Sequence, residues 1–593
     1  MFLRCTRRKK DGKEHRYWSI AESRRCAGGR VVQRPVLYLG EINDSQRAAW
    51  CRVIEGFDED RARTRPLALF PWDREVPAHA ADCGVGVRLK DFELHRPRQW
   101  GACWLACHLY EQLGLDAFWA QRLPDSREGT RWRHILQTLV CYRLIDPGSE
   151  WRLHRQWFER STMGDLLGAD FSLAEKNALY RVHDKLLEHK PALFAHLADR
   201  WKDLFGAKFE VLLYDLTSTY FESDPPFPDE DKRQFGYSRD KRSDCVQVVI
   251  ALIVTPEGFP LAYEVLSGNT SDKTTLRAFL DKIETQYGKA ERIWVMDRGI
   301  PTEAVLEEMR ASDPPVFYLV GTPKARLKKY EADLLAQPWK SVREGVDVKL
   351  HDEDGELYVF AQSRDRVAKE RAMRRRQLRG LLRRLRELQE MKLSAKNLLL
   401  KLGEAKAKHR AAWRLIDFEL PEARSEESHA TFTWRLNRKK LRQVRRREGR
   451  YLLRTNLCGK DPAELWSFYM QLVEIEAAFK NLKDDLHLRP IYHQLEERIE
   501  AHIFIAFLAY CLHVTLRARL RPLAGGLTPR AVLDKFAALQ MLDVHFPTTD
   551  GRTLILSRYT QPEPDQKILL TQLNLQLPPQ PPPRITSSGP FPR

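Results

Sequence analysis

The chain has 593 residues, enough for about three to four domains and a sizeable core. Hydrophobic residues make up 43% and charged residues 30%, which is typical of a soluble globular protein. The formal net charge of +18 indicates a polyanionic partner, most often nucleic acid, although an arginine surplus can also serve solubility alone.

Membrane and secretory classes are disfavoured by the distribution of apolar residues. The first residues carry charge but no apolar signal core. The longest apolar run, which starts at Ile503, has about twelve residues and suits a buried helix better than a bilayer span. The ten cysteines are scattered, and the one tight pair, Cys103 and Cys107, has no second pair at zinc-finger distance. We therefore expect reduced thiols and a location in the bacterial cytoplasm or nucleoid.

The first two hundred residues change from mixed structure to helix. Segments 18–25 and 34–42 predict a pair of strands, and 44–57 predicts a helix that begins at an Asp cap. From 91 to 205 the pattern is helical, because segments 132–145 and 177–201 repeat apolar residues at i, i+3, i+4 and i+7.

After residue 205 the apolar period shortens to that of strands. The expected elements are strands at 209–219, 244–254, 260–268, 291–299 and 314–323, with helices at 272–288 and 302–312. The resulting order is βββαβαβ. The first and fourth strands each end in a carboxylate, Asp215 and Asp297, and we expect these two strands to be neighbours.

A basic insertion follows. A hairpin is expected at 346–363 and a long basic helical stretch at 364–410, after which 431–457 returns to strands. The basic helix is interpreted as a DNA-binding arm, with a solvated helical hairpin as the alternative.

The helix predicted at 461–486 has the clearest start in the chain. Asp461 stands at the N-cap, Pro462 at the first helical position, and Glu464 where it completes a capping box. An apolar helix is expected at 496–517, and the proline-rich last thirty residues are expected to be disordered.

Three acidic residues carry the chemical hypothesis. Two divalent ions roughly 3.5–4 Å apart can activate a nucleophilic oxygen and stabilise a leaving oxygen at a phosphodiester, and they need converging carboxylates. Asp215 and Asp297 would lie side by side, although either one alone could simply cap a turn. Glu476 shares a predicted helix face with Tyr469, Leu472 and Lys483, which suits an active-site wall but equally a solvated stripe.

These residues resemble a known family. The segment YMQLVEIEAAFKNLK is similar to the Tyr-Arg-Glu-Lys signature of insertion-sequence DDE transposases, with Tyr469, Glu476 and Lys483 in place. Leu472 stands where the family usually has Arg. Stretches around Asp215 (YDLTSTYFES) and Asp297 (VMDRGIP), together with FGYSRDKRSDCVQVVIALIV, SGNTSDKTTL and LHLRPIYHQLEERIEAHIFIAFLAY, follow the same branch over roughly residues 100–520.

The resemblance implies a multidomain α/β protein. Its core would be a ribonuclease H-like mixed sheet flanked by helices, interrupted by an insertion domain with strands and basic helices, after a largely helical N-terminal region. It also implies Mg²⁺- or Mn²⁺-dependent cleavage of double-stranded DNA at transposon ends and strand transfer, by a homo-oligomer (dimer) on DNA. Two ions would be held by Asp215, Asp297 and Glu476, and Tyr469, Lys483 and Arg298 would contact DNA.

The expected organisation has six parts. They are an N-terminal α+β region (1–90), a helical DNA-binding domain (91–205), the first part of the catalytic core (206–324), the insertion domain (325–450), the second part of the core with the glutamate helix (451–525) and a C-terminal region with the proline-rich tail (526–593). Two other functions stay open: a catalytically inactive or domesticated DNA-binding protein, which Leu472 motivates, and another ribonuclease H-like nuclease.

Overall fold

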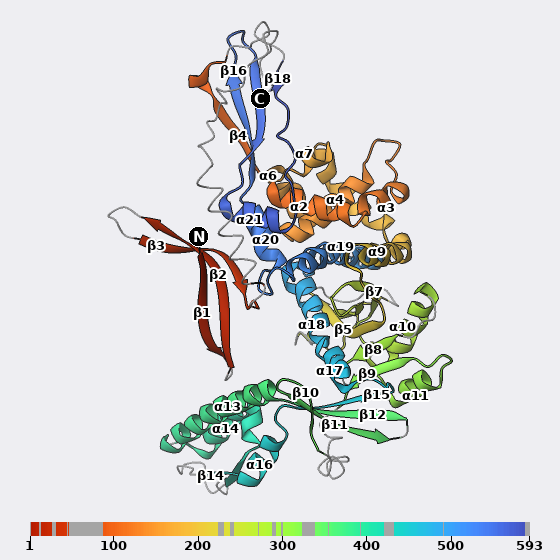
Figure 1. Ribbon diagram of the computed structural model, residues 1–593, viewed down its shortest axis with the longest axis vertical. Coiled ribbons are helices and arrows are strands. Elements are labelled where there is room, and N and C mark those ends of the chain that lie inside the picture. The colour runs from red at the N-terminus through yellow and green to blue at the C-terminus, as the bar shows by residue number, and fades with distance from the viewer. Residues whose placement is uncertain are drawn as a thin grey trace.

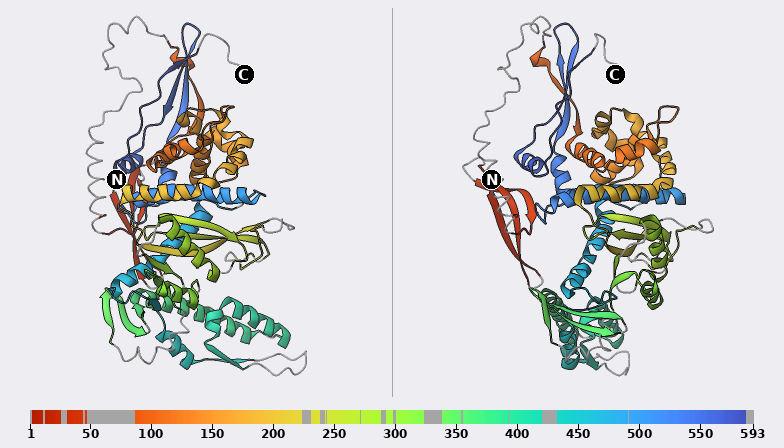
Figure 2. Two further views of the ribbon diagram at one scale, coloured as in Figure 1. Left: turned by 90° about the vertical axis from the view of Figure 1, so that its right-hand side faces the viewer. Right: turned by 45° about the vertical axis from the view of Figure 1, so that its right-hand side comes forward.

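The protein is built from layers stacked along one long axis (Figure 1). The computed structural model describes residues 2–10, 13–25, 31–43, 46, 87–222, 231–237, 242, 244–270, 272–287, 292–297, 300–322, 338–353, 355–391, 393–419, 432–489 and 491–586. At one end stands a four-stranded sheet, followed by a helical layer, the central sheet and a helical hairpin at the other end. The N-terminal sheet lies along one side of this stack (Figure 2).

The N-terminal sheet has three antiparallel strands, β1 (Phe2–Lys10), β2 (Lys13–Arg25) and β3 (Val31–Gly40). The predicted strand pair is therefore confirmed, whereas the helix predicted at 44–57 lies outside the described residues apart from Gln46. Gly40 touches the turn after the long apolar helix, where a Cβ atom at Gly40 would stand 2.3 Å from the Cα atom of Gly526. Only a residue without a side chain permits this approach.

The helical layer confirms the predicted pattern of 91–205. Its helices are α2 (Gly101–Gln112), α3 (Leu115–Arg122), α4 (Trp132–Ile145), α5 (Glu150–Arg152), α6 (Phe158–Arg160), α7 (Met163–Leu167), α8 (Lys176–Arg181) and α9 (Lys190–Phe205). The single helix expected at 177–201 is broken by two 3-10 turns, η5 (His183–Lys185) and η6 (Leu187–His189). Pro191 lies in the first turn of α9, where a helix tolerates proline because the backbone N–H has no intrahelical partner there.

Helix α19 (Glu496–Leu520) crosses the middle of the molecule and packs against α4 and η5. Among the described residues it is the one helix whose length and composition would suit a membrane span, but 94% of its apolar window is buried inside the protein. The prediction of a buried helix is confirmed.

The central sheet contains the predicted βββαβαβ unit. Its strands are β5 (Val211–Phe221), β6 (Val246–Val254), β7 (Pro260–Ser267), β8 (Ile293–Met296) and β9 (Phe317–Gly321), with α10 (Asp272–Tyr287) and α11 (Glu303–Ala311) between them. The spatial order is β9-β8-β5-β6-β7, antiparallel from β5 to β7 and parallel from β5 through β8 to β9. This is the ribonuclease H-like topology. Nearly continuous burial along β5, β6 and β8 indicates that both faces of the sheet are covered.

The insertion enlarges this same sheet. Strands β10 (Lys340–Arg343), β11 (Val346–Glu353), β12 (Glu356–Ser363) and β15 (Arg450–Thr455) extend it beyond β9 to nine strands. Between β12 and β15 the chain forms α13 (Arg364–Glu390), α14 (Ala395–Lys408), α15 (Arg410–Trp413), the strand pair β13 (Ile416–Glu419) and β14 (Thr433–Leu436), and α16 (Arg438–Arg446). The prediction of strands throughout 431–457 was wrong at α16. Helices α13 and α14 share an apolar core of their own, which includes Leu381, Leu385 and Leu402.

The C-terminal region closes the four-stranded sheet. Helices α20 (Pro529–Phe536) and α21 (Pro564–Gln572) accompany β16 (Gln540–Pro547), β17 (Thr553–Tyr559) and β18 (Arg584–Ile585), and β16 also pairs with β4 (Glu93–Gln99). The tail was predicted to be disordered, and this is wrong as far as Thr586. The amide of Gln580 bonds the backbone of Tyr559 in both directions, at 3.0 and 2.9 Å, which fixes the proline-rich segment along β17.

Candidate active site at the β5–β8 junction

Two of the predicted carboxylates lie at matched positions on neighbouring parallel strands. Strand β5 pairs with β8 from Val211↔Ile293 to Tyr214↔Met296, and Asp215 and Asp297 are the next residues on each side. Residues in register on adjacent parallel strands point to the same face and lie about 4.8 Å apart. The prediction that the two strands are neighbours is confirmed.

Asp215 was expected at the end of its strand, and this prediction was wrong. Strand β5 continues to Phe221, and this second half pairs only with β6, because β8 stops at Met296. The Asp215 carboxylate thus lies where the pairing of β5 with β8 ends. It is half-buried, and its Oδ1 accepts a hydrogen bond from the Leu216 N–H at 2.8 Å, whereas Asp297 is exposed.

The strands beneath these carboxylates are held rigidly. Tyr214 is fully buried, and its hydroxyl is 2.7 Å from the Thr275 hydroxyl on α10, while its ring centre lies 5.3 Å from that of Phe279. All four residues of β8 are buried. Asp215 and Asp297 therefore directly follow buried, well-packed strand residues, and these residues form a rigid support for a metal ligand.

Glu476 reaches the site region from a helix that is shorter than predicted. The expected helix 461–486 is divided into α17 (Pro462–Met470), α18 (Leu472–Lys480) and the π-helical turn η7 (Asn481–Asp485), with a turn at Gln471. Helix α18 packs against β5 and β6 through a buried face and exposes Glu476. Glu474 fixes α18 to α19 through an ion pair with Arg517 at 2.6 Å.

The three carboxylates are not drawn into one tight cluster. Among the described residues, only a different set of acidic and histidine side chains has all its ligand atoms within 4.8 Å of one another. Asp215 and Asp297 share a sheet position, and Glu476 stands on the helix that packs on the same strand. Two Mg²⁺ ions do not require one tight cluster of carboxylates, because each ion keeps several water molecules and binds only one or two protein carboxylates.

The start of α17 also differs from the prediction. Asp461 occupies the N-cap position and Pro462 follows it, as expected, but the Asp461 side chain makes no capping hydrogen bond. Glu464 pairs instead with Lys460 at 3.1 Å, so that the capping box does not form.

Tyr469 lies beside Asp297, an arrangement that depends on Gly321. A Cβ atom at Gly321 would stand 2.9 Å from the Tyr469 hydroxyl and 3.4 Å from Asp297 Oδ1. The Tyr469 ring also lies 6.0 Å from that of Tyr451. Sequence reasoning did not single out Gly321, although a glycine at the end of an apolar strand is a signal for close approach of another group.

The other three residues singled out in the sequence, Lys483, Leu472 and Arg298, differ in their structural surroundings. Lys483 lies in the π-helical turn η7 and is half-buried, so that the break at Gln471 and this turn remove the single helix face predicted for it. Leu472 is half-buried and packs against the main apolar core, so that its side chain is used for packing at the position where the signature has Arg. Arg298 lies outside the described residues.

The donor chemistry fits hard divalent ions. Asp215, Asp297 and Glu476 offer only carboxylate oxygens, which Mg²⁺ and Mn²⁺ prefer over imidazole or thiolate. Two of the three are exposed and the third is half-buried, so that ions with retained water molecules and a DNA strand can reach them.

Comparison with known proteins gives two family matches and one structural likeness. The family described as "Transposase DDE domain" matches residues 206–512, more than half of the chain, and "IS1634 family transposase, N-terminal domain" matches residues 3–66. A search of the curated proteins found no match. The solved structures include a piggyBac transposase synaptic complex with hairpin DNA, 9% identical, covering 73% of this chain and 76% of that chain at a TM-score of 0.33, which is too low to carry an argument.

The family match spans both halves of the ribonuclease H-like unit and the insertion between them, and it includes all three carboxylates. Members of this family are nucleases and strand transferases that act on DNA with divalent metal ions. The chain belongs to the insertion-sequence DDE transposases.

Proposed function

We propose that Asp215, Asp297 and Glu476 hold two Mg²⁺ or Mn²⁺ ions, with which the protein cuts DNA at transposon ends and joins them to target DNA. The observation that carries this proposal is the register of β5 and β8, whose last pair, Tyr214↔Met296, directly precedes the two aspartates. The bound ions would supply Lewis acidity to the attacking and leaving oxygens. The protein's own residues would orient those oxygens and the DNA backbone.

The two steps exchange bonds at phosphorus without a redox reagent. In cleavage, a water oxygen forms a bond to phosphorus and the 3′ oxygen of the element's end leaves with a proton. In strand transfer, that 3′ hydroxyl attacks a target phosphodiester, and the displaced target oxygen takes the proton. Tyr469, Lys483 and Arg298 are proposed to contact the phosphates, and Tyr469 lies beside Asp297 as this role requires.

The other parts of the proposal concern the assembly. The helical domain 91–205 would read the terminal sequence, the 325–450 insertion would contact flanking DNA, and two copies would bring the two ends together in the bacterial cytoplasm. The division into these domains rests on the sequence pattern and on the topology of the central sheet.

The test is cleavage of a labelled duplex that carries the element's terminal repeat, with Mg²⁺ and with EDTA. We expect Asp215→Asn, Asp297→Asn and Glu476→Gln each to lower cleavage by about three orders of magnitude, because the loss of a metal ligand removes several kcal/mol of transition-state stabilisation. DNA affinity should persist, since the basic surface supplies it. Asp281→Asn and Glu497→Gln, at exposed positions on α10 and α19, are the matched controls and should cleave normally.

A second function is favoured by the packing of Leu472. If this copy binds transposon ends without cutting them, the wild-type protein will shift the labelled duplex and leave it intact with either metal. That outcome would sink the catalytic proposal and leave a DNA-binding protein.

A further inference from the structure

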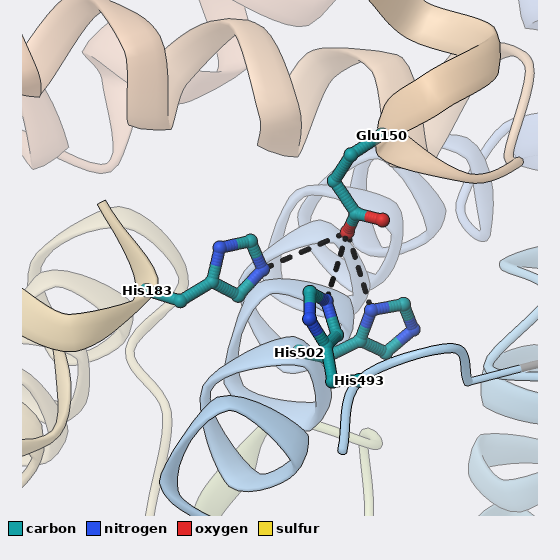
Figure 3. A group of neighbouring side chains, drawn as sticks. All are labelled: Glu150, His183, His493 and His502. Atoms are coloured by element: carbon teal, nitrogen blue, oxygen red, sulfur yellow. Dashed lines mark hydrogen bonds and ion pairs between the residues drawn. The ribbon is translucent and has the colours of Figure 1, made fainter. Parts of the chain in front are cut away.

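A second group of potential metal ligands lies away from the β5–β8 junction. Glu150 on α5, His183 on η5, His493 in the segment before α19 and His502 on α19 converge with all ligand atoms within 4.8 Å of one another (Figure 3). All four residues are buried, with His183 exposed by 1% and His502 by 2%. Four chain segments that are distant in sequence therefore bring one carboxylate and three imidazoles to one point inside the protein.

The three nitrogen–oxygen distances to Glu150 are longer than short hydrogen bonds and close to the ligand–ligand distances of a metal coordination shell. The nearest nitrogens of His493 and His502 lie 3.4 Å from Glu150 Oε1, and that of His183 lies 3.6 Å from the same oxygen. A charge-assisted hydrogen bond to a carboxylate would measure about 2.7–2.9 Å. Ligands about 2.0–2.1 Å from a tetrahedral Zn²⁺ stand roughly 3.3–3.4 Å apart along each edge of the tetrahedron.

The tautomer of His183 also favours a cation between its ring and Glu150. Its Nδ1 lies 2.9 Å from the Leu179 carbonyl oxygen, which can only accept, so that Nδ1 carries the proton. In the neutral ring the Nε2 lone pair then faces Glu150, an arrangement that is repulsive unless a cation lies between the two atoms. A second ring nitrogen fixed by a backbone carbonyl is the usual support of a metal-bound histidine.

His502 supplies an independent observation. Within the described ranges neither of its ring nitrogens has a hydrogen-bond partner, although the side chain is 98% buried. A buried polar group without a partner costs about 1–3 kcal/mol, so that such a group in a well-packed core calls for a ligand.

We propose that Glu150, His183, His493 and His502 form a tetrahedral site for Zn²⁺ or a similar first-row divalent ion. Four protein ligands fill a tetrahedron and leave no position for substrate, which makes the site structural and not catalytic. Imidazole donors select such ions, whereas the carboxylate-only junction suits Mg²⁺. The ion would staple α5 and η5 of the helical layer to α19 and to the segment that follows the glutamate helix.

Arg143 is the nearest other charge. Its Nη2 lies 4.0 Å from Glu150 Oε1, and its Nη1 donates to the His487 carbonyl oxygen at 2.9 Å. In a cluster without metal, this guanidinium would balance the carboxylate alone and the imidazoles would stay neutral. That arrangement satisfies the charge of Glu150 but leaves the lone pair of His183 facing it and, among the described residues, His502 Nε2 without a hydrogen-bond partner.

The experiment measures bound metal in the purified full-length protein by mass spectrometry, after dialysis against a weak chelator. We expect about one Zn²⁺ or similar first-row divalent ion per chain in the wild type, in Asp297→Asn and in His513→Gln. His513 is a buried histidine of α19 outside the cluster and serves as the control. Glu150→Gln and His502→Gln should lose the ion. A strong chelator should lower the Tm of the wild type by roughly 4 °C or more, and Zn²⁺ should restore it.

Should the variants fail to fold, titration of chelated wild-type protein with Co²⁺ decides the question. A visible spectrum of tetrahedral cobalt, saturating at one equivalent, supports the site. No metal in the purified protein together with no cobalt spectrum overturns it, as does a metal content that is unchanged in folded Glu150→Gln. Because Asp297→Asn is tested alongside, failure of this site and failure of the catalytic proposal give different results.

Discussion

Gly321 is the last residue of strand β9 and lies against Tyr469 of helix α17. Replacing it by Ala would place a methyl group 2.9 Å from the Tyr469 hydroxyl, and the tyrosine would have to move away from Asp297. We expect cleavage to fall by roughly tenfold to a hundredfold, since small misplacements at a reacting centre have effects of that order. Binding of the terminal repeat and the Tm should change little, because the displaced atom is the far end of a side chain.

The control for this substitution is Gly403→Ala on α14. No atom lies within 4 Å of the added methyl group there, and helix propensity should stabilise the protein by up to about 1 kcal/mol. Cleavage and thermal unfolding of both variants can be measured side by side. Unchanged cleavage in Gly321→Ala would mean that Tyr469 has no part in the reaction.

Asp543 is held ionised inside the four-stranded sheet. Burial raises the pKa of its carboxyl, but hydrogen bonds from Arg98 at 2.9 and 3.0 Å and from Ser557 at 2.7 Å outweigh burial and lower it below the usual value. A carboxyl with a lowered folded-state pKa stabilises the protein above its unfolded pKa, near 3.9, and loses this contribution as the pH falls through the folded value.

Asp543→Asn should therefore lower the free energy of unfolding by about 3 kcal/mol at pH 7, because it leaves the buried Arg98 charge with only one of its two carboxylate partners, Asp165 at 3.1 Å. The difference from wild type should shrink below about pH 4. Urea unfolding between pH 3 and pH 7 measures it. Asp203→Asn, whose side chain is 68% exposed and 3.5 Å from Arg200, should cost less than about 1 kcal/mol at every pH. If the difference in unfolding free energy between Asp543→Asn and the wild type did not change with pH, the lowered pKa of Asp543 would be contradicted.

Among the described helices, α13 carries the largest number of basic side chains. Arg375, Arg379, Arg383 and Arg386 are exposed and recur at spacings of four, four and three residues, which places them along one side of the helix. Arg384, by contrast, pairs with Glu387 at 3.0 Å. The buried leucines of the hairpin face α14, so that the arginine side is available to DNA phosphates.

Replacing Arg379 and Arg383 together by Gln should weaken binding to any duplex sequence alike. The slope of log affinity against log salt should become shallower by about 1.8, roughly 0.9 for each phosphate that the variant no longer neutralises. Lys202→Gln on α9, where the lysine pairs with Asp199 at 3.3 Å, removes a charge elsewhere and serves as the control. An unchanged slope would favour the alternative in which this helical hairpin is merely solvated.

Elements with local signals were predictable from the sequence, and long-range relations were not. Apolar runs predicted the five strands of the ribonuclease H-like unit and the neighbouring positions of Asp215 and Asp297, because strand order follows from connection rules. The break at Gln471 and the π-helical turn interrupt a sequence whose helical period is unbroken, since tertiary packing overrides propensity there. The cluster around Glu150 could not be foreseen, because its members come from four separate segments.

On the scale of the whole molecule, the helical hairpin is an appendage of the nine-stranded sheet. The segment enters and leaves at adjacent points, where the Ser363 N–H donates to the Gly449 carbonyl oxygen at 3.0 Å between the antiparallel strands β12 and β15. Its apolar core is separate from the main core. The sheet and the triad should therefore fold without it.

A protein in which residues 364–448 are replaced by a short Asn-Gly turn should stay soluble, with a Tm within several degrees of the wild type. It should lose most of its DNA affinity, because the α13 arginines go with the segment. Circular dichroism melting and a gel-shift titration measure the two effects. An aggregated product would show that the hairpin supports the central sheet, against the separation of the two cores.

The pairing of β4 with β16 has a consequence for synthesis of the protein on the ribosome. Arg98 and Asp543, which meet across these strands, are 445 residues apart, so that at about 5–20 residues per second the second partner appears roughly twenty to ninety seconds after the first. Until then β4 presents an open edge to the cell's proteases and chaperones, and Arg98 lacks one of its two carboxylate partners. A message interrupted before residue 540 yields a nascent chain that cannot complete the four-stranded sheet, and only completed translation yields a durable enzyme.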